Sequence, residues 1–492
     1  MNSELDRGNH SPNGHKVIAG PGVRKRINAT TKLAVGLVSF FLTACATTQK
    51  LKPSADTLRE IGQSAVDDDG IVGLSIAVSL GGNTIFAEGF GYADLERTTP
   101  ASPTTSYDLG SIGKQFTATA TMLLVDEGRL SLSDRLYDLV PETPRHFPNA
   151  TVHQLLQHTS GFVAGPFDDL DPPPGLDQPR RGLEVLNSTD LQGGRSVFPA
   201  GETFIYCNPA YTMLGTVIEA ASGRPFTEFI TSELIEPLNL TMTTVGQRPS
   251  PPQMADSLCR SEDGIARVPF IHMSVYGGAG SICSSVSDLL AWELALDEGR
   301  VLSPNSLQQL KSPARVQGSF ATAEIPYGMG QRLGTFLGYR KSGHTGTYAG
   351  GSASLAHYPE AGLTIAVASN TYGNGTPHAR LIEAEVARAL LSPVGSDEPV
   401  AGVPLTEEEQ SQIAGYYGTG SVIEARFENS DTLLLLREGK ESDRMVHVGE
   451  FVFRKPKNPN SREWFLLDGE AAGWWLYEVD GFLMGVDRRV EP

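Results

Sequence analysis

The pattern of hydrophobic and polar residues changes along the chain in a way that predicts its architecture. Residues 55–67 repeat their apolar positions at helical spacing, and two β-rich runs follow at 71–80 and 83–94. Residues 129–300 have a mostly helical pattern, and β-rich runs return after residue 340. Strands at both ends of this region bracket a helical middle, which predicts a sheet built from the two ends with a helical insertion.

The last part of the chain has a different pattern. Residues 392–404 have the composition of a linker, and Thr406 and Glu409 offer a capping box for a short helix. From Tyr416 on, short β-rich runs alternate with turns. Even spacing and aromatic content predict a small antiparallel barrel or sandwich over residues 405–492.

The N-terminal stretch combines a basic region with an apolar one. Arg24, Lys25 and Arg26 precede LAVGLVSFFLTA, which is too short to span a bilayer, and Cys45 follows directly. This resembles a bacterial lipoprotein signal, although an ordinary buried cysteine is the alternative. The resemblance implies a signal peptide at 1–44, lipidation of Cys45 and a tether at 45–54. Because alanine rather than aspartate follows Cys45, we expect sorting to the outer membrane, facing the periplasm.

Charge and cysteine content exclude several classes of function. A net charge of −18 argues against binding to nucleic acid or to anionic lipid through charge. Cys207, Cys259 and Cys283 allow at most one disulfide, and their spacing is not that of a zinc site. The histidines form no metal motif either, so we expect no metal and no cofactor.

One motif at the start of a predicted helix carries chemistry. Ser111 and Lys114 lie three residues apart in YDLGSIGKQF, and Gly128 supplies a left-handed stop after the helix. This spacing places the hydroxyl and the amine on one helix face, where they can share a hydrogen bond. A lysine that is desolvated, or near another cation, is neutral enough to take the serine proton. Free N–H groups at the helix N-terminus suit an oxyanion at the serine.

Ser-x-x-Lys alone is a weak signal, because a chain of this length often contains one by chance. A solvated serine beside an exposed lysine is then the ordinary explanation. A phosphate loop is excluded, since the glycine spacing is too short and Gln115 replaces the required Ser or Thr. Support for catalysis therefore has to come from elsewhere in the chain.

Two further motifs give that support. Tyr206 and Asn208 flank Cys207 immediately before a predicted helix, and a phenol can relay a proton while an amide holds a substrate carbonyl. His344 and Gly346 precede a predicted hairpin and would point to the same face of a strand, where glycine lets a substrate lie close. Each motif alone has a structural alternative: a core tyrosine, a helix-capping asparagine, or a surface histidine.

In this order, the three motifs resemble the serine β-lactamase and D-Ala-D-Ala carboxypeptidase superfamily, and most closely its class C β-lactamase-like branch. The resemblance covers about residues 57–391 and includes the phrases QLLQHTSGF, FPAGETFIYCNPAYTMLG, GGAGSICSSVSDLLAW and YGMG. It implies an α+β hydrolase domain at 55–391, with an antiparallel β-sheet flanked by helices and an all-α insertion. The C-terminal region is similar to the lipocalin-like β-barrels appended to some of these hydrolases.

The resemblance also implies roles for individual residues. Ser111 would be the acylated nucleophile, and Lys114 and Tyr206 the general-base and proton-relay pair. The substrate-binding residues would be Asn208, His344, Thr345, Gly346 and Thr347. The backbone N–H groups of Ser111 and Thr347 would form the oxyanion hole. We interpret Cys207 as a tolerated small side chain in the tyrosine motif and not as a nucleophile.

His344 stands where most β-lactamases have lysine, which favours a peptidase or an esterase. A histidine with an ordinary pKa near 6.5 is mostly neutral at pH 7. We therefore expect weak recognition of a substrate carboxylate at neutral pH. The ratio of kcat/KM for a carboxylate-bearing substrate to kcat/KM for a neutral ester should rise as pH falls from 8 to 6. The same ratio should be higher in His344→Lys than in the wild type.

The expected function is a lipid-anchored serine hydrolase of the bacterial cell envelope that cleaves amide or ester bonds through an acyl-enzyme. Candidate substrates are D-amino-acid peptides, small esters and β-lactams. The alternative is a non-catalytic penicillin sensor that is acylated without turnover. Membrane contact would come through the lipid alone, and the sequence indicates no oligomeric state.

Overall fold

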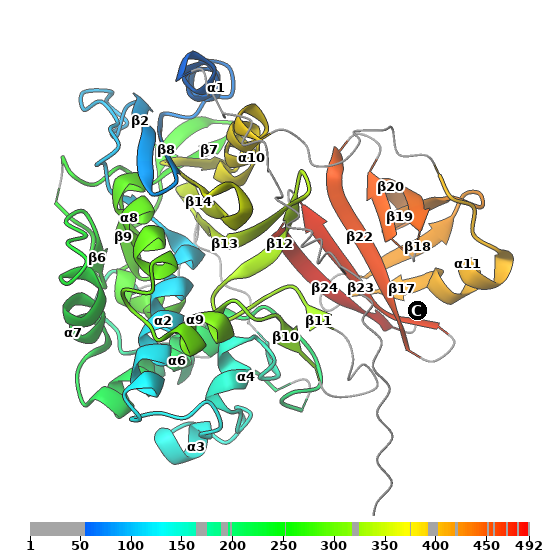
Figure 1. The fold of residues 1–492 in the computed structure, drawn as a ribbon, viewed down its shortest axis with the longest axis horizontal. Coiled ribbons are helices and arrows are strands. Elements are labelled where there is room, and N and C mark those ends of the chain that lie inside the picture. Colours follow the sequence, from blue (N-terminus) through cyan, green and yellow to red (C-terminus); the bar gives the residue numbers. More distant parts are fainter. Residues whose placement is uncertain are drawn as a thin grey trace, which may run out of the picture. The chain divides into compact units, whose positions relative to one another are not determined.

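A six-stranded antiparallel sheet is built from both ends of the hydrolase region in the computed structural model (Figure 1), and this confirms the predicted fold class. Its strand order is β12-β13-β14-β15-β1-β2. The strands are β1 (Gly73–Leu80), β2 (Asn83–Gly91), β12 (Arg332–Phe336), β13 (Tyr339–Tyr348), β14 (Gly351–Tyr358) and β15 (Leu363–Ser369). The structure describes residues 55–163, 175–187, 195–196, 199–250, 252–316, 324–373, 375–391, 402–418, 422–449, 452–455, 458–468, 471–479 and 482–490.

The central strands are buried on both faces because helices cover both sides. β1 pairs with β15 from Leu74↔Ser369 to Leu80↔Leu363, so segments far apart in sequence are neighbours in the sheet. Alternate residues enter different cores: Ile76 packs with α1 (Ala55–Asp67) and α10 (Ala379–Leu390), whereas Ala77 belongs to the core on the other face.

The helical insertion lies between β2 and β12, as the sequence pattern predicts. Its longest helices are α2 (Gly113–Asp126), α6 (Asn208–Ser222) and α8 (Val286–Asp297). The shorter ones are α3 (Leu136–Leu139), α4 (Val152–Leu156), α5 (Gly182–Asn187), α7 (Phe226–Ile230) and α9 (Pro304–Leu310). Short turns of helix are η1 (Gly110–Ile112), η2 (Thr231–Ile235), η3 (Met273–Val275), η4 (Gly277–Ala279) and, in the sheet region, η5 (Pro359–Ala361).

The hydrolase region contains more strand than the sequence pattern predicts. Small sheets join β3 (Tyr107–Asp108), β9 (Ile282–Ser284) and β6 (Thr244–Val245), and join β16 (Thr371–Gly373), β7 (Leu258–Ser261) and β8 (Gly264–Arg267). Two-stranded pairs are β4 (Phe162–Val163) with β5 (Arg195–Ser196) and β10 (Ala314–Arg315) with β11 (Glu324–Ile325). Strands of two to four residues are too short to show periodicity.

The helix after the nucleophile differs from the prediction in its surroundings. We expected α2 to bury one apolar face, but every residue from Gly113 to Met122 is buried. Gly128 has a φ of +70°, in agreement with the predicted left-handed stop. A helix enclosed on all sides has little freedom to move. The start of α2 can therefore hold reactive groups in fixed positions.

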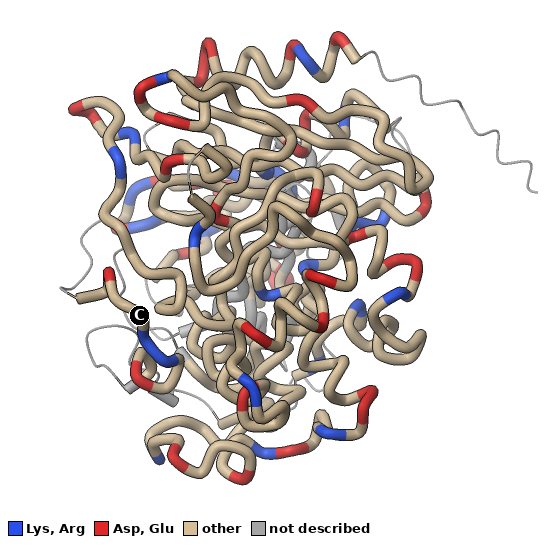
Figure 2. Tube along the Cα trace, turned by 90° about the vertical axis from the view of Figure 1, so that its left-hand side faces the viewer, with Lys and Arg blue, Asp and Glu red and all other residues tan. Residues whose placement is uncertain are grey.

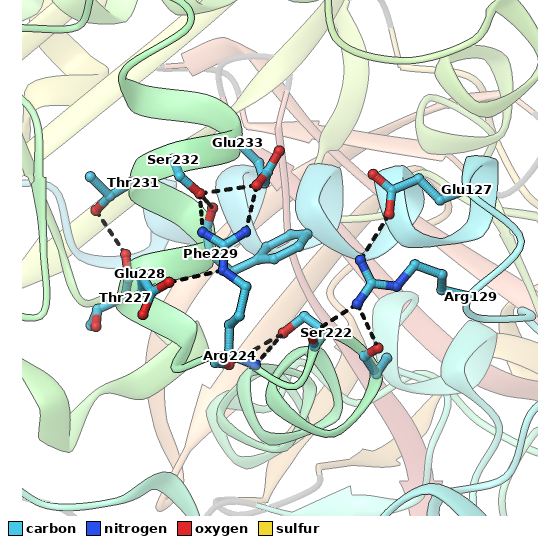
Figure 3. Close-up of polar contacts among 11 residues, drawn as sticks. Glu127, Arg129, Ser222, Arg224, Thr227, Glu228, Phe229, Thr231, Ser232 and Glu233 are labelled. Atoms are coloured by element: carbon cyan, nitrogen blue, oxygen red, sulfur yellow. Dashed lines mark hydrogen bonds and ion pairs between the residues drawn. The ribbon is translucent and has the colours of Figure 1, made fainter.

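The C-terminal ends of the α2 and α6 segments are joined by polar contacts (Figure 3). Arg129 pairs with Glu127 and donates to the carbonyl oxygens of Ala221 and Ser222 at 3.1 and 2.8 Å. Arg224 continues the cluster into α7 by pairing with Glu228. The two helices whose N-terminal ends carry Ser111, Lys114 and Asn208 are therefore tied at their other ends.

The C-terminal region forms a closed barrel, as the sequence predicts. The barrel strands are β17 (Gly415–Tyr417), β18 (Ile423–Phe427), β19 (Thr432–Arg437), β20 (Lys440–Gly449), β21 (Val452–Lys455), β22 (Asn458–Asp468), β23 (Ala471–Val479) and β24 (Phe482–Val490). α11 (Glu407–Ile413) precedes them, and Thr406 and Glu409 form the predicted capping box. Phe453, Phe465 and Trp475 lie in the barrel core.

Several predicted segments lie outside the described residues. They are the signal and tether at 1–54, most of the loop 167–181 and most of the linker 392–404. Figure 2 shows acidic positions spread along the described chain with basic positions between them. No helix of the described part is long and apolar enough to cross a membrane.

Candidate active site

Ser111 lies on η1, a single turn that leads directly into α2. Gly110, just before it, has a φ of +51°, a left-handed conformation that glycine adopts at little cost. Lys114 follows in the first turn of α2, and its Nζ lies 2.9 Å from the Ser111 Oγ. The structure thus brings together the two side chains whose spacing indicated a shared hydrogen bond. Ser111 is partly exposed, whereas Lys114 is fully buried.

The contacts of Lys114 determine which way its lone pair points. Nζ lies 2.8 Å from the side-chain oxygen of Asn208 and 2.8 Å from the carbonyl oxygen of Ala279. These two oxygens only accept hydrogen bonds, so a neutral amine must spend both N–H groups on them. The Ser111 hydroxyl at 2.9 Å and the Tyr206 hydroxyl are also beside Nζ, and both can donate. In the neutral form, the lysine lone pair is therefore left for a hydroxyl proton, and the Ser111 hydroxyl lies at hydrogen-bond distance.

The surroundings of Lys114 favour that neutral form. Burial lowers the pKa of Lys114, and the positive charge of Arg332 lowers it further, although Tyr206 acts in the opposite direction. Arg332, on β12, is itself buried, and its guanidinium lies 5.1 Å from the ring centre of Tyr206. We expected either desolvation or a neighbouring cation, and the structure supplies both, with Arg332 as the cation.

Tyr206 stands between these two cations. Lys114 Nζ lies 5.0 Å from the centre of its ring. Burial raises the pKa of Tyr206, but Lys114 and Arg332 outweigh burial, so the pKa is lowered overall. Hydrogen bonding to the Ser111 and Lys114 side chains also lowers the pKa of Tyr206, so its hydroxyl lies beside both of them. A phenol with this environment can exchange a proton with a group placed next to the serine.

Asn208 begins α6 and is oriented by Lys114. Because its side-chain oxygen accepts from the lysine, its NH₂ group is left to donate to another partner. Neighbouring Cys207 is fully buried, and burial raises the pKa of its thiol to about 12. A buried thiol that stays protonated is a poor nucleophile, in agreement with the structural interpretation of Cys207.

Two glycines allow β13 to approach the nucleophile turn. A Cβ atom at Gly346 would lie 1.8 Å from the carbonyl oxygen of Leu109 and 3.0 Å from the backbone nitrogen of Ser111. A Cβ atom at Gly110 would lie 2.9 Å from the backbone nitrogen of Thr347. The absence of both side chains therefore brings the Ser111 and Thr347 backbones together, which is what an oxyanion hole made by their N–H groups requires. Gly346 makes room for the protein backbone, whereas we expected it to make room for a substrate.

His344 is placed differently from our expectation. Its side chain is fully buried, with Nε2 3.2 Å from the Tyr327 hydroxyl and Nδ1 2.6 Å from the Thr345 carbonyl oxygen. Burial, together with Arg332 and Lys114, holds the pKa of His344 well below its usual range. His344 therefore does not present a titrating group to a carboxylate between pH 6 and 8. Thr345 is also buried, whereas Thr347 is exposed.

Sequence reasoning missed the residues behind Tyr206. His158, at a φ of +56°, accepts a hydrogen bond from the Cys207 backbone N–H at Nδ1, and its Nε2 lies 3.1 Å from the Tyr327 hydroxyl. Burial, Lys114 and Arg332 keep the pKa of His158 well below its usual range. A neutral His158 must then donate from Nε2, so that Tyr327 can donate in turn to His344. The phrases QLLQHTSGF and YGMG contain His158 and Tyr327, but neither phrase shows that they meet.

The protein's own side chains and backbone groups at this site are those that acyl transfer needs. In the described part of the chain, no three His, Cys, Asp or Glu residues are grouped so that they could hold a metal ion. A serine beside a buried lysine, a tyrosine between two cations and a pair of converging backbone N–H groups define the class of serine hydrolases that work with a Ser-Lys pair.

Comparison with known proteins gives the family. The Beta-lactamase family model matches residues 58–389, so the chain belongs to this family. Penicillin-binding protein 4* of Bacillus subtilis (strain 168) is 26% identical over 313 residues, which cover 60% of this chain and 67% of that protein. Protein flp of Staphylococcus aureus (strain NCTC 8325 / PS 47) is 32% identical over 181 residues, 36% of this chain. That match spans only 35% of Protein flp.

Solved structures share the fold. A penicillin-binding protein homologue from Pyrococcus abyssi, described as octameric, superposes with a TM-score of 0.61 at 24% identity, over 88% of this chain and 99% of that one. A D-stereospecific amidohydrolase from Streptomyces sp. superposes with a TM-score of 0.56 at 24% identity, over 70% of this chain and 100% of that one.

Proposed function

We propose that this protein hydrolyses amide or ester bonds of D-amino-acid compounds through an acyl-enzyme on Ser111. The contacts of Lys114 carry the proposal, because Asn208 and Ala279 only accept hydrogen bonds and leave the lysine lone pair for a hydroxyl proton, with the Ser111 hydroxyl 2.9 Å away. β-Lactams are candidate substrates through the same acylation step. D-amino-acid amides are candidates because similar folds occur in a D-stereospecific amidohydrolase and a D-amino acid amidase.

In acylation, Lys114 takes the proton of Ser111 as Oγ attacks the carbonyl carbon. The developing oxyanion is stabilised by the backbone N–H groups of Ser111 and Thr347, and Asn208 donates its NH₂ group to the substrate. The proton taken by Lys114 moves through the Tyr206 hydroxyl, which lies beside Ser111 and Lys114, to the leaving group. Water then cleaves the acyl-enzyme by the reverse route.

We also propose that the protein is attached to the cell envelope by lipid on Cys45. Support comes from the basic and apolar stretch before that cysteine, and from the similarity to a penicillin-binding protein. Cys45→Ala should give an unprocessed or soluble form. Wild-type protein that is recovered without detergent, and without the mass of a lipid, would contradict attachment.

A substrate panel tests the proposed chemistry. The purified protein and Ser111→Ala are compared on a D-alanyl-D-alanine peptide, a D-amino acid amide, 4-nitrophenyl acetate and a chromogenic cephalosporin. We expect turnover of at least one substrate by the wild type and none by the variant. A stable one-to-one adduct without turnover would favour the penicillin sensor.

A further inference from the structure

A histidine outside the three motifs contacts the strand that forms one wall of the site. His378 lies just before α10, and its Nε2 is 2.8 Å from the hydroxyl oxygen of Thr347 at the end of β13. Thr347 is exposed, and its backbone nitrogen lies next to Gly110, the residue before Ser111. The contact therefore falls beside the candidate oxyanion hole.

The other ring nitrogen of His378 fixes where the proton lies. Nδ1 is 3.1 Å from the backbone nitrogen of Arg380 and accepts its N–H, which caps the start of α10. A backbone N–H can only donate, so Nδ1 carries no proton and a neutral ring is protonated at Nε2. Burial, with Arg380 and Arg332, lowers the pKa of His378 to about 3, so the ring is neutral at physiological pH.

The protonation state of His378 determines the direction of its hydrogen bond with the Thr347 hydroxyl. His378 donates to its oxygen, so the hydroxyl proton has to point to another acceptor. Among the described residues, no hydrogen bond runs from this hydroxyl to a protein acceptor. Because Thr347 is exposed beside the site, its hydroxyl presents an oriented donor to whatever binds there.

We propose that His378 is a positioning residue that orients the Thr347 hydroxyl toward a hydrogen-bond acceptor on the substrate. The enzyme then favours substrates with a carbonyl or carboxylate oxygen next to the scissile bond. This inference rests on the proposed function, since it assigns part of the substrate preference to the same site. In this proposal the Thr347 hydroxyl, held by His378, takes the role in substrate recognition that we had assigned to His344. The buried ring of His344 cannot contact the substrate.

Two thioesters that differ in one group test this preference. Both carry N-acetyl-D-alanine as the acyl part, and the leaving group is mercaptoacetate in one and propanethiol in the other. The ratio of their kcat/KM values measures the contribution of the carboxylate. Comparing that ratio between variants cancels the difference in leaving-group reactivity.

Four variants separate the contact from the helix cap. His378→Asn keeps a side chain that caps α10 well but is too short to reach Thr347. Thr347→Val removes the hydroxyl at nearly constant shape, and Thr347→Ser restores it. The fourth variant combines His378→Asn with Thr347→Val. Thermal unfolding of each variant checks that the fold is kept.

We expect the ratio to fall about 5- to 10-fold in both His378→Asn and Thr347→Val, as for the loss of one hydrogen bond. The double variant should fall no further than Thr347→Val, because His378 acts through that hydroxyl. Thr347→Ser should stay near the wild type. An unchanged ratio in His378→Asn, or additive losses in the double variant, would overturn the inference.

Nitrogen NMR of the histidine ring gives a result that does not depend on turnover. Nδ1 of His378 should be unprotonated and Nε2 protonated from pH 5 to 8, and Thr347→Val should shift the Nε2 resonance. A protonated Nδ1 would overturn the inference even if the enzyme is active. Absence of hydrolysis of both thioesters, and of the substrate panel, by the wild type would remove the proposed function and this inference with it.

Discussion

The side-chain nitrogen of Lys114 lies 2.9 Å from the hydroxyl oxygen of Ser111, and two further contacts are oxygens that only accept hydrogen bonds. A neutral lysine in this position therefore keeps its lone pair for a hydroxyl proton, and the Ser111 hydroxyl lies at hydrogen-bond distance. Burial and Arg332 make the neutral form easier to reach than for a lysine in water.

Removing the amine should slow acylation without removing the nucleophile. Lys114→Met keeps an unbranched side chain in a fully buried position, and we expect labelling of Ser111 by a fluorophosphonate to slow about 10²-fold or more. The labelling rate is measured by quenching the reaction at a series of times and determining the labelled fraction by intact-protein mass spectrometry. Labelling of Lys114→Met at the wild-type rate would show that another group takes the proton.

A negative charge next to Lys114 should shift the pH dependence in a defined direction. Asn208→Asp places a carboxylate where the amide oxygen accepts from Nζ at 2.8 Å. An opposite charge at this distance favours the ammonium form, so it raises the pKa of Lys114. Activity should then fall at pH 7 and recover at higher pH, with the acidic limb of kcat/KM moved upward by at least about one unit.

Asn208→Ala is the neutral control for this shift. It removes an acceptor of the lysine without adding charge, so it should lower activity without moving the acidic limb upward. An unmoved limb in Asn208→Asp would mean that Lys114 does not set the pH dependence.

Much of the fold could be predicted because its elements are long enough to show periodicity. The hairpin around Gly81 and Gly82 and the helix ended by Gly223 were predicted from turn chemistry and apolar spacing, and both are present. The pairing of β1 with β15 was predicted only in outline, because nothing local in either strand names its distant partner. The division into domains at 55–391 and 405–492 remains a prediction.

The site could be predicted only for residues whose type and spacing indicate a chemical role without knowledge of their neighbours. The spacing and residue types of two motifs predicted one shared site, and the structure brings their residues together: Ser111, Lys114, Tyr206 and Asn208. His158, Tyr327 and Arg332 were missed, because a histidine or arginine becomes informative only when its neighbours are known. His344 was assigned to the substrate from its motif, but its buried ring contacts the Tyr327 hydroxyl.

A side chain added at Gly346 should disrupt the oxyanion hole. The new Cβ of Gly346→Ala would overlap the Leu109 carbonyl oxygen at 1.8 Å, so β13 has to move away from Ser111. We expect kcat to fall about 10²- to 10³-fold, as for the loss of one oxyanion donor. Gly182→Ala is a matched control, because its Cβ would first meet the Thr216 hydroxyl at 3.1 Å. Equal activity of both variants would contradict this assignment.

The buried position of His344 reverses our expectation for His344→Lys. An ammonium there would be buried close to Arg332 and Lys114, whose charges already oppose protonation of the imidazole. We expect the free energy of unfolding to fall by about 3 kcal/mol or more, with no gain in preference for carboxylates. Denaturant unfolding measures the loss, and neutral His344→Gln, which can still accept from Tyr327, should lose less. A stable lysine variant that gains carboxylate preference would restore the original assignment.

Covalent labelling of Ser111 tests the central claim most directly. The wild type and Ser111→Ala are treated with a fluorophosphonate and with a penicillin, and the site of each adduct is located by peptide mass spectrometry. We predict one adduct per chain on Ser111 of the wild type and none on Ser111→Ala. An adduct on Cys207 or any other residue, or unchanged labelling of Ser111→Ala, would contradict the account.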